Sequence, residues 1–189
     1  MTILRPALVF LAAFTAITGV VYPLFVTGVT RVLFSDTTGG SLLVRDGIVV
    51  GSELVGQRFT SERYFHGRPS AAGADGYDAA ASSGSNLGPT SAVLLTRVGA
   101  DVASLRAAGA TSIPADAVTT SASGLDPHVS LETALLQVSR VAAARGMTTA
   151  ALEALVEAHA EGRALGLMGE PRVNVLRINL ALDAATEQP

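Results

Sequence analysis

The chain has 189 residues, of which 49% are hydrophobic and 15% are charged, and its net charge is −3. This hydrophobic content is enough for a buried core and excludes a wholly disordered protein. The basic residues are dispersed, which argues against a nucleic-acid partner because such proteins present a concentrated basic face. The sequence holds thirteen arginines and neither lysine nor cysteine. Its composition therefore excludes lysine nucleophiles, disulfides, cysteine–metal sites and lipid-modified cysteines.

The first hydrophobic stretch, residues 7–29, carries no charge and lies between Arg5 and Arg31. A helix of this length spans roughly 34 Å, enough to cross a hydrocarbon core of about 30 Å. We therefore predict an N-terminal transmembrane anchor over residues 1–34. A cleaved signal peptide is the alternative, but its apolar region would be only about 7–15 residues long and would end at a small-residue cleavage site.

Small residues lie four positions apart along one stripe of this helix, where they would let a second helix approach closely. Pro23 removes a backbone hydrogen bond, which is easier to tolerate beside a neighbouring helix. We predict a membrane-helix interface that consists of Ala12, Thr15, Ala16, Gly19 and Pro23. The alternative is that such residues are simply common in membrane helices.

The charges that flank the anchor suggest its orientation. The short overhang before it holds the α-amine and Arg5, and a long following domain crosses the membrane largely regardless of its own charges. We predict a single-pass protein of the cell (inner or plasma) membrane, with its N-terminus in the cytoplasm and residues 35–189 outside. Arg31 counts against this orientation.

Residues 35–189 are predicted to form one small mixed α/β (α+β) domain. Asp46-Gly47 between two β-rich runs indicates a hairpin over residues 41–50. One or two helical turns are expected over residues 61–66, followed by an ordered surface loop over residues 67–90. A helix should follow from Ser91 to about Ala108.

The C-terminal half is predicted to contain a helical hairpin between two strands. The expected elements are a short strand at 118–121, a helix at 131–145 capped by Ser130 and stopped by Gly146, a second helix at about 149–161 and a strand at 173–180.

Residues 118–130 contain the most polar and ionisable side chains close together in the sequence. The Thr and Ser hydroxyls of this stretch, together with Asp126 and His128, could converge on a polar ligand or a partner. The alternative is a capped loop, in which Asp126 and Ser130 organise turns and His128 fills a side pocket. The chain's three histidines lack metal-binding spacing, so no metal site is predicted. A catalytic Gly-x-Ser-x-Gly elbow is also missing from the sequence. The candidate binding or partner-contact residues are Ser121, Ser123, Asp126, His128, Asn86 and Arg68.

Several motifs in order along the chain resemble one family, the C subunit of the bacterial potassium-transporting P-type ATPase, the Kdp complex. The matching stretches are Pro23-Leu24 and residues 51–57, 64–70, 82–89, 121–128 and 169–176. The resemblance covers nearly the whole chain.

The resemblance implies a non-catalytic subunit of a high-affinity potassium uptake pump that stabilises and assembles the complex. Its implied partners are a potassium-translocating subunit, a P-type ATPase subunit and a small accessory subunit. It also implies a catalytic chaperone that raises the ATP affinity of the pumping subunit, so ATP would act through that subunit and the chain would need no intrinsic cofactor. The alternative is a freestanding membrane-tethered extracytoplasmic module that binds a small ligand.

Overall fold

The computed structural model describes residues 3–186. The chain divides into two compact units, Met1–Leu42 and Leu43–Pro189, and each is described by itself.

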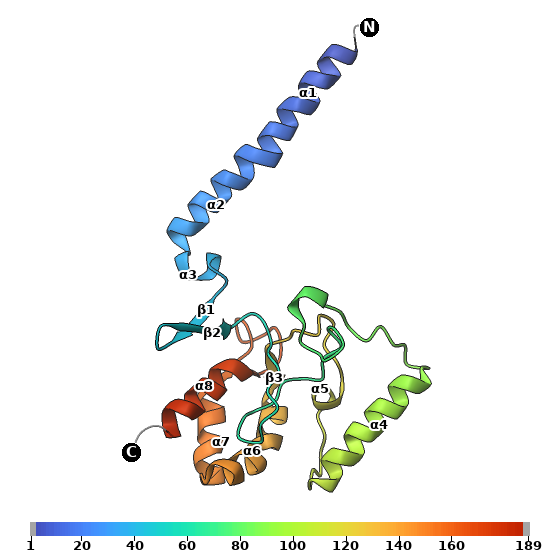
Figure 1. Ribbon diagram of the computed structural model, residues 1–189, viewed down its shortest axis with the longest axis vertical. Helices are drawn as coiled ribbons and strands as arrows, with labels where there is room; N and C mark the ends of the chain where they lie inside the picture. Colours follow the sequence, from blue (N-terminus) through green and yellow to red (C-terminus); the bar gives the residue numbers. More distant parts are fainter. Residues whose placement is uncertain (1–2, 187–189) are drawn as a thin grey trace. The chain divides into compact units, whose positions relative to one another are not determined.

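The first unit is built on one long apolar helix (Figure 1). α1 (Leu4–Ala16), η1 (Ile17–Val21) and α2 (Tyr22–Leu33) follow one another without interruption, and the short α3 (Ser35–Thr38) comes next. Among residues 3–186, this is the one helix long and apolar enough to cross a membrane. It agrees with the predicted anchor and extends beyond residues 7–29 at both ends.

The middle of this helix is a wider turn that lies directly before Pro23. In η1 the backbone bonds span five residues, and the N–H of Tyr22 donates to the carbonyl of Ile17. Proline has no N–H to donate, and widened turns of this kind commonly accompany such interruptions in long helices. The predicted stripe of Ala12, Thr15, Ala16 and Gly19 lies along α1 and η1 with its side chains exposed.

The predicted hairpin is present as β1 (Leu42–Arg45) and β2 (Ile48–Ser52), paired in a two-stranded sheet. Asp46 and Gly47 have φ values of +52° and +77°. Both central residues of a type I′ hairpin turn need positive φ, which explains the Asp-Gly pair.

Residues 67–90 form the predicted irregular segment, interrupted by one turn of 3-10 helix, η2 (Ala79–Ala81). α4 (Ala92–Ala107) then follows as predicted, with the Oγ of Ser91 accepting from the N–H of Leu94. α4 contacts α5 (Ala115–Val118), which occupies part of the predicted strand at 118–121. That strand prediction was wrong, because Pro114 starts a helical turn that the Thr119 hydroxyl closes on the carbonyl of Ala115 at 2.7 Å.

The predicted helical hairpin consists of α6 (Leu131–Arg145) and α7 (Thr149–Ala158), which pack together. Ser130 accepts from the N–H of Thr133 at 3.0 Å, and Gly146 ends α6 with a φ of +68°. Both caps confirm the prediction. α7 ends three residues earlier than expected, because β4 (Ala160–Glu161) pairs with a strand instead.

The predicted strand at 173–180 was wrong for most of its length. Only β5 (Arg172–Asn174) is a strand, and α8 (Val175–Thr186) follows it directly. The side chain of Asn174 accepts from the N–H of Arg177 at 3.1 Å, as an N-cap does. The buried positions that follow, 175, 176, 178, 179 and 182, have helical spacing.

A small antiparallel sheet and the helices around it enclose the core of the second unit. β5 is central, between β3 (His128–Ser130) and β4, with Val173 opposite both Val129 and Ala160. The core is formed by apolar side chains from the sheet, α6, α7 and α8, together with Phe65 from an irregular segment. The second unit is therefore an α+β structure, as predicted.

Residues 61–66 form a turn and an extended segment in place of the predicted helical turns. Each backbone carbonyl from 62 to 66 accepts a hydrogen bond from a side chain of α6 or α8. In order, the donors are Arg140 (2.8 Å), Arg145 (2.6 Å), Arg140 (3.1 Å), Asn179 (2.9 Å) and Gln137 (3.0 Å). These long-range donors hold the segment against α6 and α8 in its non-helical conformation.

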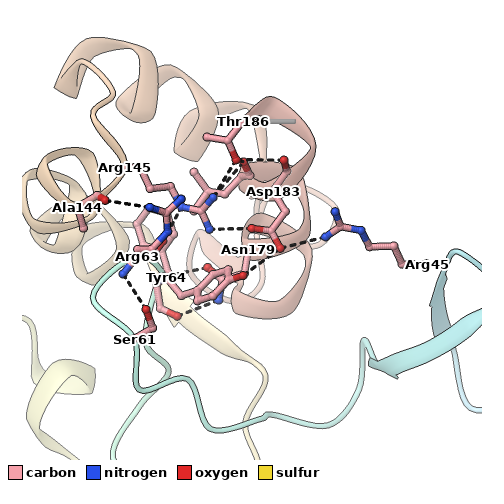
Figure 2. Close-up of polar contacts among 11 residues, drawn as sticks. Arg45, Ser61, Arg63, Tyr64, Ala144, Arg145, Asn179, Asp183 and Thr186 are labelled. Carbon is pink, nitrogen blue, oxygen red and sulfur yellow. Dashed lines mark hydrogen bonds and ion pairs between the residues drawn. The ribbon is translucent and has the colours of Figure 1, made fainter. Parts of the chain in front are cut away.

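Figure 2 shows the ion pair that fastens this segment to α6 and α8. The buried guanidinium of Arg145 lies 2.8 Å from Asp183 and stacks 4.8 Å from the centre of the Tyr64 ring. Asp183 also accepts from the Tyr64 hydroxyl at 3.1 Å and from Arg45 at 3.0 Å. Burial opposes the charge of Asp183, but the bonds from Arg145 and Tyr64 outweigh it and hold the pKa of this carboxyl below its ordinary value.

Candidate functional site

Three of the predicted site residues, Arg68, Asp126 and His128, meet at an open pocket of about 490 Å³. Arg68 comes from the irregular segment after the core residue Phe65, and His128 is the first residue of β3. The rest of the wall is supplied by α5, the start of α6 and the residues around β5. The fold therefore brings together side chains that lie about sixty positions apart.

A row of ionisable side chains extends from this pocket to β4. Arg68 Nη1 lies 3.1 Å from Asp126 Oδ2, and the two ring nitrogens of His128 lie 3.7 Å from Asp126 and 3.8 Å from Glu161. Glu161 in turn lies 2.9 Å from Nε of Arg172. The row thus joins residues on both sides of the central strand β5. Each of its two carboxylates is paired with an arginine, Asp126 with Arg68 and Glu161 with Arg172.

Arg68 is also bound to backbone and side-chain oxygens at the end of α5. Its Nη2 donates at 3.4 Å to the carbonyl and hydroxyl of Thr119 and to the carbonyl of Thr120. An arginine can serve several acceptors at once because its donors form a planar fork. This side chain therefore ties the loop containing Asp126 to α5.

Electrostatics at the pocket favour a charged Asp126. Burial opposes ionisation, but hydrogen bonding from His128 and the charge of Arg68 outweigh it, so the pKa of Asp126 lies below its ordinary value. Burial and, to a lesser extent, the negative charge of Asp126 raise the pKa of Tyr77 to about 12. The positive charge of Arg68 acts in the opposite direction and lowers it. The Tyr77 hydroxyl remains a donor and binds the carbonyl of Arg68 at 2.6 Å.

The other predicted site residues lie elsewhere. Ser121 is buried, and Ser123 accepts from the N–H of Leu125 at 3.1 Å while its carbonyl accepts from the Ser82 hydroxyl. Asn86 is exposed in the irregular segment with a φ of +52°. The structure therefore does not gather all six candidates around one ligand.

Residues 121–128 pack closely against other parts of the chain. Gly124 has a φ of +69°, and a Cβ on it would lie 2.7 Å from both the Ala72 side chain and the Ser83 carbonyl. Asp126 accepts from the N–H of His128 at 3.0 Å, which organises a turn. The turn at Asp126 and the cap from Ser130 are those that the capped-loop alternative describes, and Arg68, Asp126 and His128 all line the pocket.

Sequence reasoning missed Asp116, Glu161 and Arg172. Asp116 lies fourteen residues before the cap of α6, yet it accepts from the N–H and hydroxyl of Ser130 at 2.7 and 2.9 Å. It also accepts from the Thr133 hydroxyl at 2.7 Å. Glu161 and Arg172 are opposite each other in β4 and β5, a pairing that a correct prediction of these short strands would have revealed.

The carboxylates of Asp126 and Glu161 are held in ion pairs with arginines. Within residues 3–186 no group of three or more His, Asp or Glu side chains could hold a metal ion. Because the carboxylates around His128 are engaged by arginines, the pocket is suited to structural cohesion or to contact with a polar partner.

Comparison with known proteins gives a consistent result over nearly the whole chain. A family model described as K+-transporting ATPase, c chain (KdpC) matches residues 4–184. The chain belongs to the KdpC family. The match includes the apolar helix as well as the second unit, so the resemblance seen in the sequence motifs is confirmed.

Individual members of the KdpC family are similar at more than half of the aligned positions. A protein of Gemmatimonas aurantiaca is 57% identical over 183 residues, covering 96% of this chain and 92% of the relative. One from Rhodopseudomonas palustris is 52% identical over 197 residues, 98% of each chain. One from Mycobacterium tuberculosis is 55% identical over 184 residues, 95% of this chain and 97% of the relative. All three are named potassium-transporting ATPase KdpC subunit.

Proposed function

We propose that this chain is a membrane-anchored accessory subunit of an ATP-driven potassium uptake pump, which it stabilises and helps to assemble. The observation that supports this most strongly is the family match over residues 4–184, which includes the apolar helix Leu4–Leu33. The proposed partners are the potassium-translocating subunit, the P-type ATPase subunit and the small accessory subunit of the same complex.

The proposed role is non-catalytic. The sequence has no lysine, so it cannot contain the Asp-Lys-Thr-Gly phosphorylation motif of P-type pumps. Asp126 at the pocket and Glu161 beside it are paired with Arg68 and Arg172, which leaves these carboxylates poorly suited to general-base chemistry. One membrane helix is also too little to enclose an ion pathway. Hydrolysis and transport therefore belong to the partners.

The proposed topology places the N-terminus in the cytoplasm and residues 35–189 outside the membrane. In that arrangement the second unit cannot touch ATP, which is bound in the cytoplasm. Any effect on ATP affinity must then be a coupling free energy, transmitted because assembly favours one state of the pumping subunit. The chain itself needs no nucleotide site or other cofactor for this role.

Copurification tests the assembly role. With an affinity tag on the ATPase subunit, we expect this chain to be retained in mild detergent in fixed proportion to the other subunits. A freestanding ligand-binding module, the alternative function, would be recovered alone and fully folded. Recovery of the chain without pump subunits would overturn the proposal.

Cysteine labelling tests the orientation, because the chain has no cysteine of its own. Ser104→Cys, on the exposed surface of α4, should react with a membrane-impermeant maleimide in intact cells. Ile3→Cys, at the other end of the apolar helix, should react only after lysis. The reverse pattern would place the second unit in the cytoplasm and make direct contact with ATP feasible.

A further inference from the structure

The loop between β4 and β5 carries an uncharged apolar tip. Residues 164–169 read Ala-Leu-Gly-Leu-Met-Gly, and the side chains of Leu165, Leu167 and Met168 are 88%, 82% and 61% exposed. Within the described part of the second unit, Leu165 and Leu167 are the most exposed large hydrophobic side chains. Contiguous exposed apolar side chains of this kind mark interaction sites.

The tip is held away from the domain by a closed base. Ala164 and Met168 exchange two backbone hydrogen bonds, at 2.8 and 3.0 Å. Below them an ion pair at 2.8 Å joins Arg163 to Glu170. Leu165 has a φ of +53°, a conformation that costs a leucine energy. The backbone therefore presents these side chains outward, where the two leucines gain little burial within their own domain.

We propose that Leu165, Leu167 and Met168 form an apolar finger that inserts into an apolar recess on another subunit of the same ATPase. This inference rests on the proposed function, since it needs a multisubunit complex. Leucine and methionine side chains suit such a recess because they are flexible enough to fill irregular apolar space.

The chemistry of the tip favours a protein over a lipid surface. Segments that bind membrane surfaces combine apolar residues with unpaired Lys or Arg, which contact anionic lipids, and often with Trp at the headgroup level. The finger has neither a basic residue nor Trp, its nearby Arg163 is engaged by Glu170, and the chain's net charge is −3. A second copy of this chain is disfavoured too, because a finger-in-recess contact between identical copies is heterologous and continues into open assemblies unless it closes.

Site-specific crosslinking identifies what covers the finger. Leu167→Cys would be the only cysteine of the chain and can carry a benzophenone maleimide in the assembled complex. Leu95→Cys on α4, whose side chain is 64% exposed, is the matched control. We expect position 167 to crosslink to another pump subunit several-fold more than position 95. Adducts to lipid only, to a second copy, or at the level of the control would each overturn the proposal.

Dissociation of the complex gives an independent measure. Replacing both leucines of the finger, Leu165→Ala with Leu167→Ala, should raise the rate at which this chain leaves the detergent-purified complex about tenfold or more. The control pair, Val93→Ala with Leu95→Ala, should change it less than about twofold, and both variants should unfold like the wild type. An unchanged dissociation rate in the finger variant would defeat this inference alone. Failure of the wild-type chain to copurify would instead defeat the proposed function.

Discussion

Asn179 holds the backbone of Phe65 in the way that a neighbouring strand would. Its Oδ1 accepts from the N–H of Phe65 at 2.8 Å, and its Nδ2 donates to the carbonyl of the same residue at 2.9 Å. Gln137 does the same for His66, at 2.8 and 3.0 Å. Two side-chain amides thereby replace a strand and fix the irregular segment that carries Phe65 into the core.

Asn179→Leu should destabilise the protein by about 3 kcal/mol, because it leaves a buried donor and a buried acceptor of Phe65 without partners. The free energy of unfolding would be measured by denaturant titration of the purified chain in detergent. Asn86→Gly is the matched control, since Asn86 is exposed and its φ of +52° suits glycine. Equal stability of the two variants would mean that the amide contributes little.

Gly124→Ala should cost about 2 kcal/mol more than Gly146→Ala. The two glycines have nearly the same φ, +69° and +68°, so an alanine suffers the same backbone strain at either position. They differ in surroundings, because a Cβ at 124 would meet Ala72 and Ser83 at 2.7 Å whereas none of the described atoms lies within 4 Å at 146. The difference between their thermal unfolding midpoints isolates the close packing of the 121–128 loop.

Acid should weaken the second unit through Asp126 and Asp183. Both carboxyls have a pKa in the folded protein below the ordinary value of about 4, so the folded state binds fewer protons than the unfolded state. Their contribution is therefore complete above about pH 4 and is lost as the pH falls through the folded pKa. Asp183→Asn should flatten this dependence when unfolding free energies are compared between pH 6 and 3. A slope identical to that of the wild type would contradict the assignment.

Ala16→Leu should weaken assembly if the predicted stripe of small residues faces a partner helix. A leucine there would keep the helix in the membrane but prevent a close approach, so the fraction of chain retained with the tagged ATPase subunit should fall several-fold. Ala13→Leu makes the same change off the stripe and should be retained like the wild type. Equal retention of both variants would show that lipid rather than protein covers this stripe.

Elements defined by neighbouring residues could be predicted from the sequence. Ser130 and Gly146 bound α6 because each makes a capping contact with the helix's own backbone, and Asp46-Gly47 defines its turn locally. The segment at 173–180 was misread because its β-branched residues alternate for a few positions before the helical spacing emerges. The cap from Asn174, which decides the matter, was overlooked.

Contacts between distant segments were beyond sequence reasoning. Residues 62–66 were predicted to be helical, yet donors 71 to 114 positions away determine their conformation. At the pocket, Arg68, Asp126 and His128 could be proposed as site residues from the sequence because their side chains are ionisable. Asp116 and Glu161 gave no local signal, since their roles arise from the cap of α6 and from strand pairing.

The side chains that donate hydrogen bonds to the backbone carbonyls of residues 62–66 have a consequence for biosynthesis. One of them, Asn179, and the carboxylate that positions Arg145, Asp183, belong to α8, the final helix in chain order. A growing chain lacks both until α8 has been synthesised, whereas the apolar helix Leu4–Leu33 emerges from the ribosome long before. Insertion must therefore precede closure of the domain, and a premature stop before α8 would leave a membrane-inserted product that quality-control proteases can recognise.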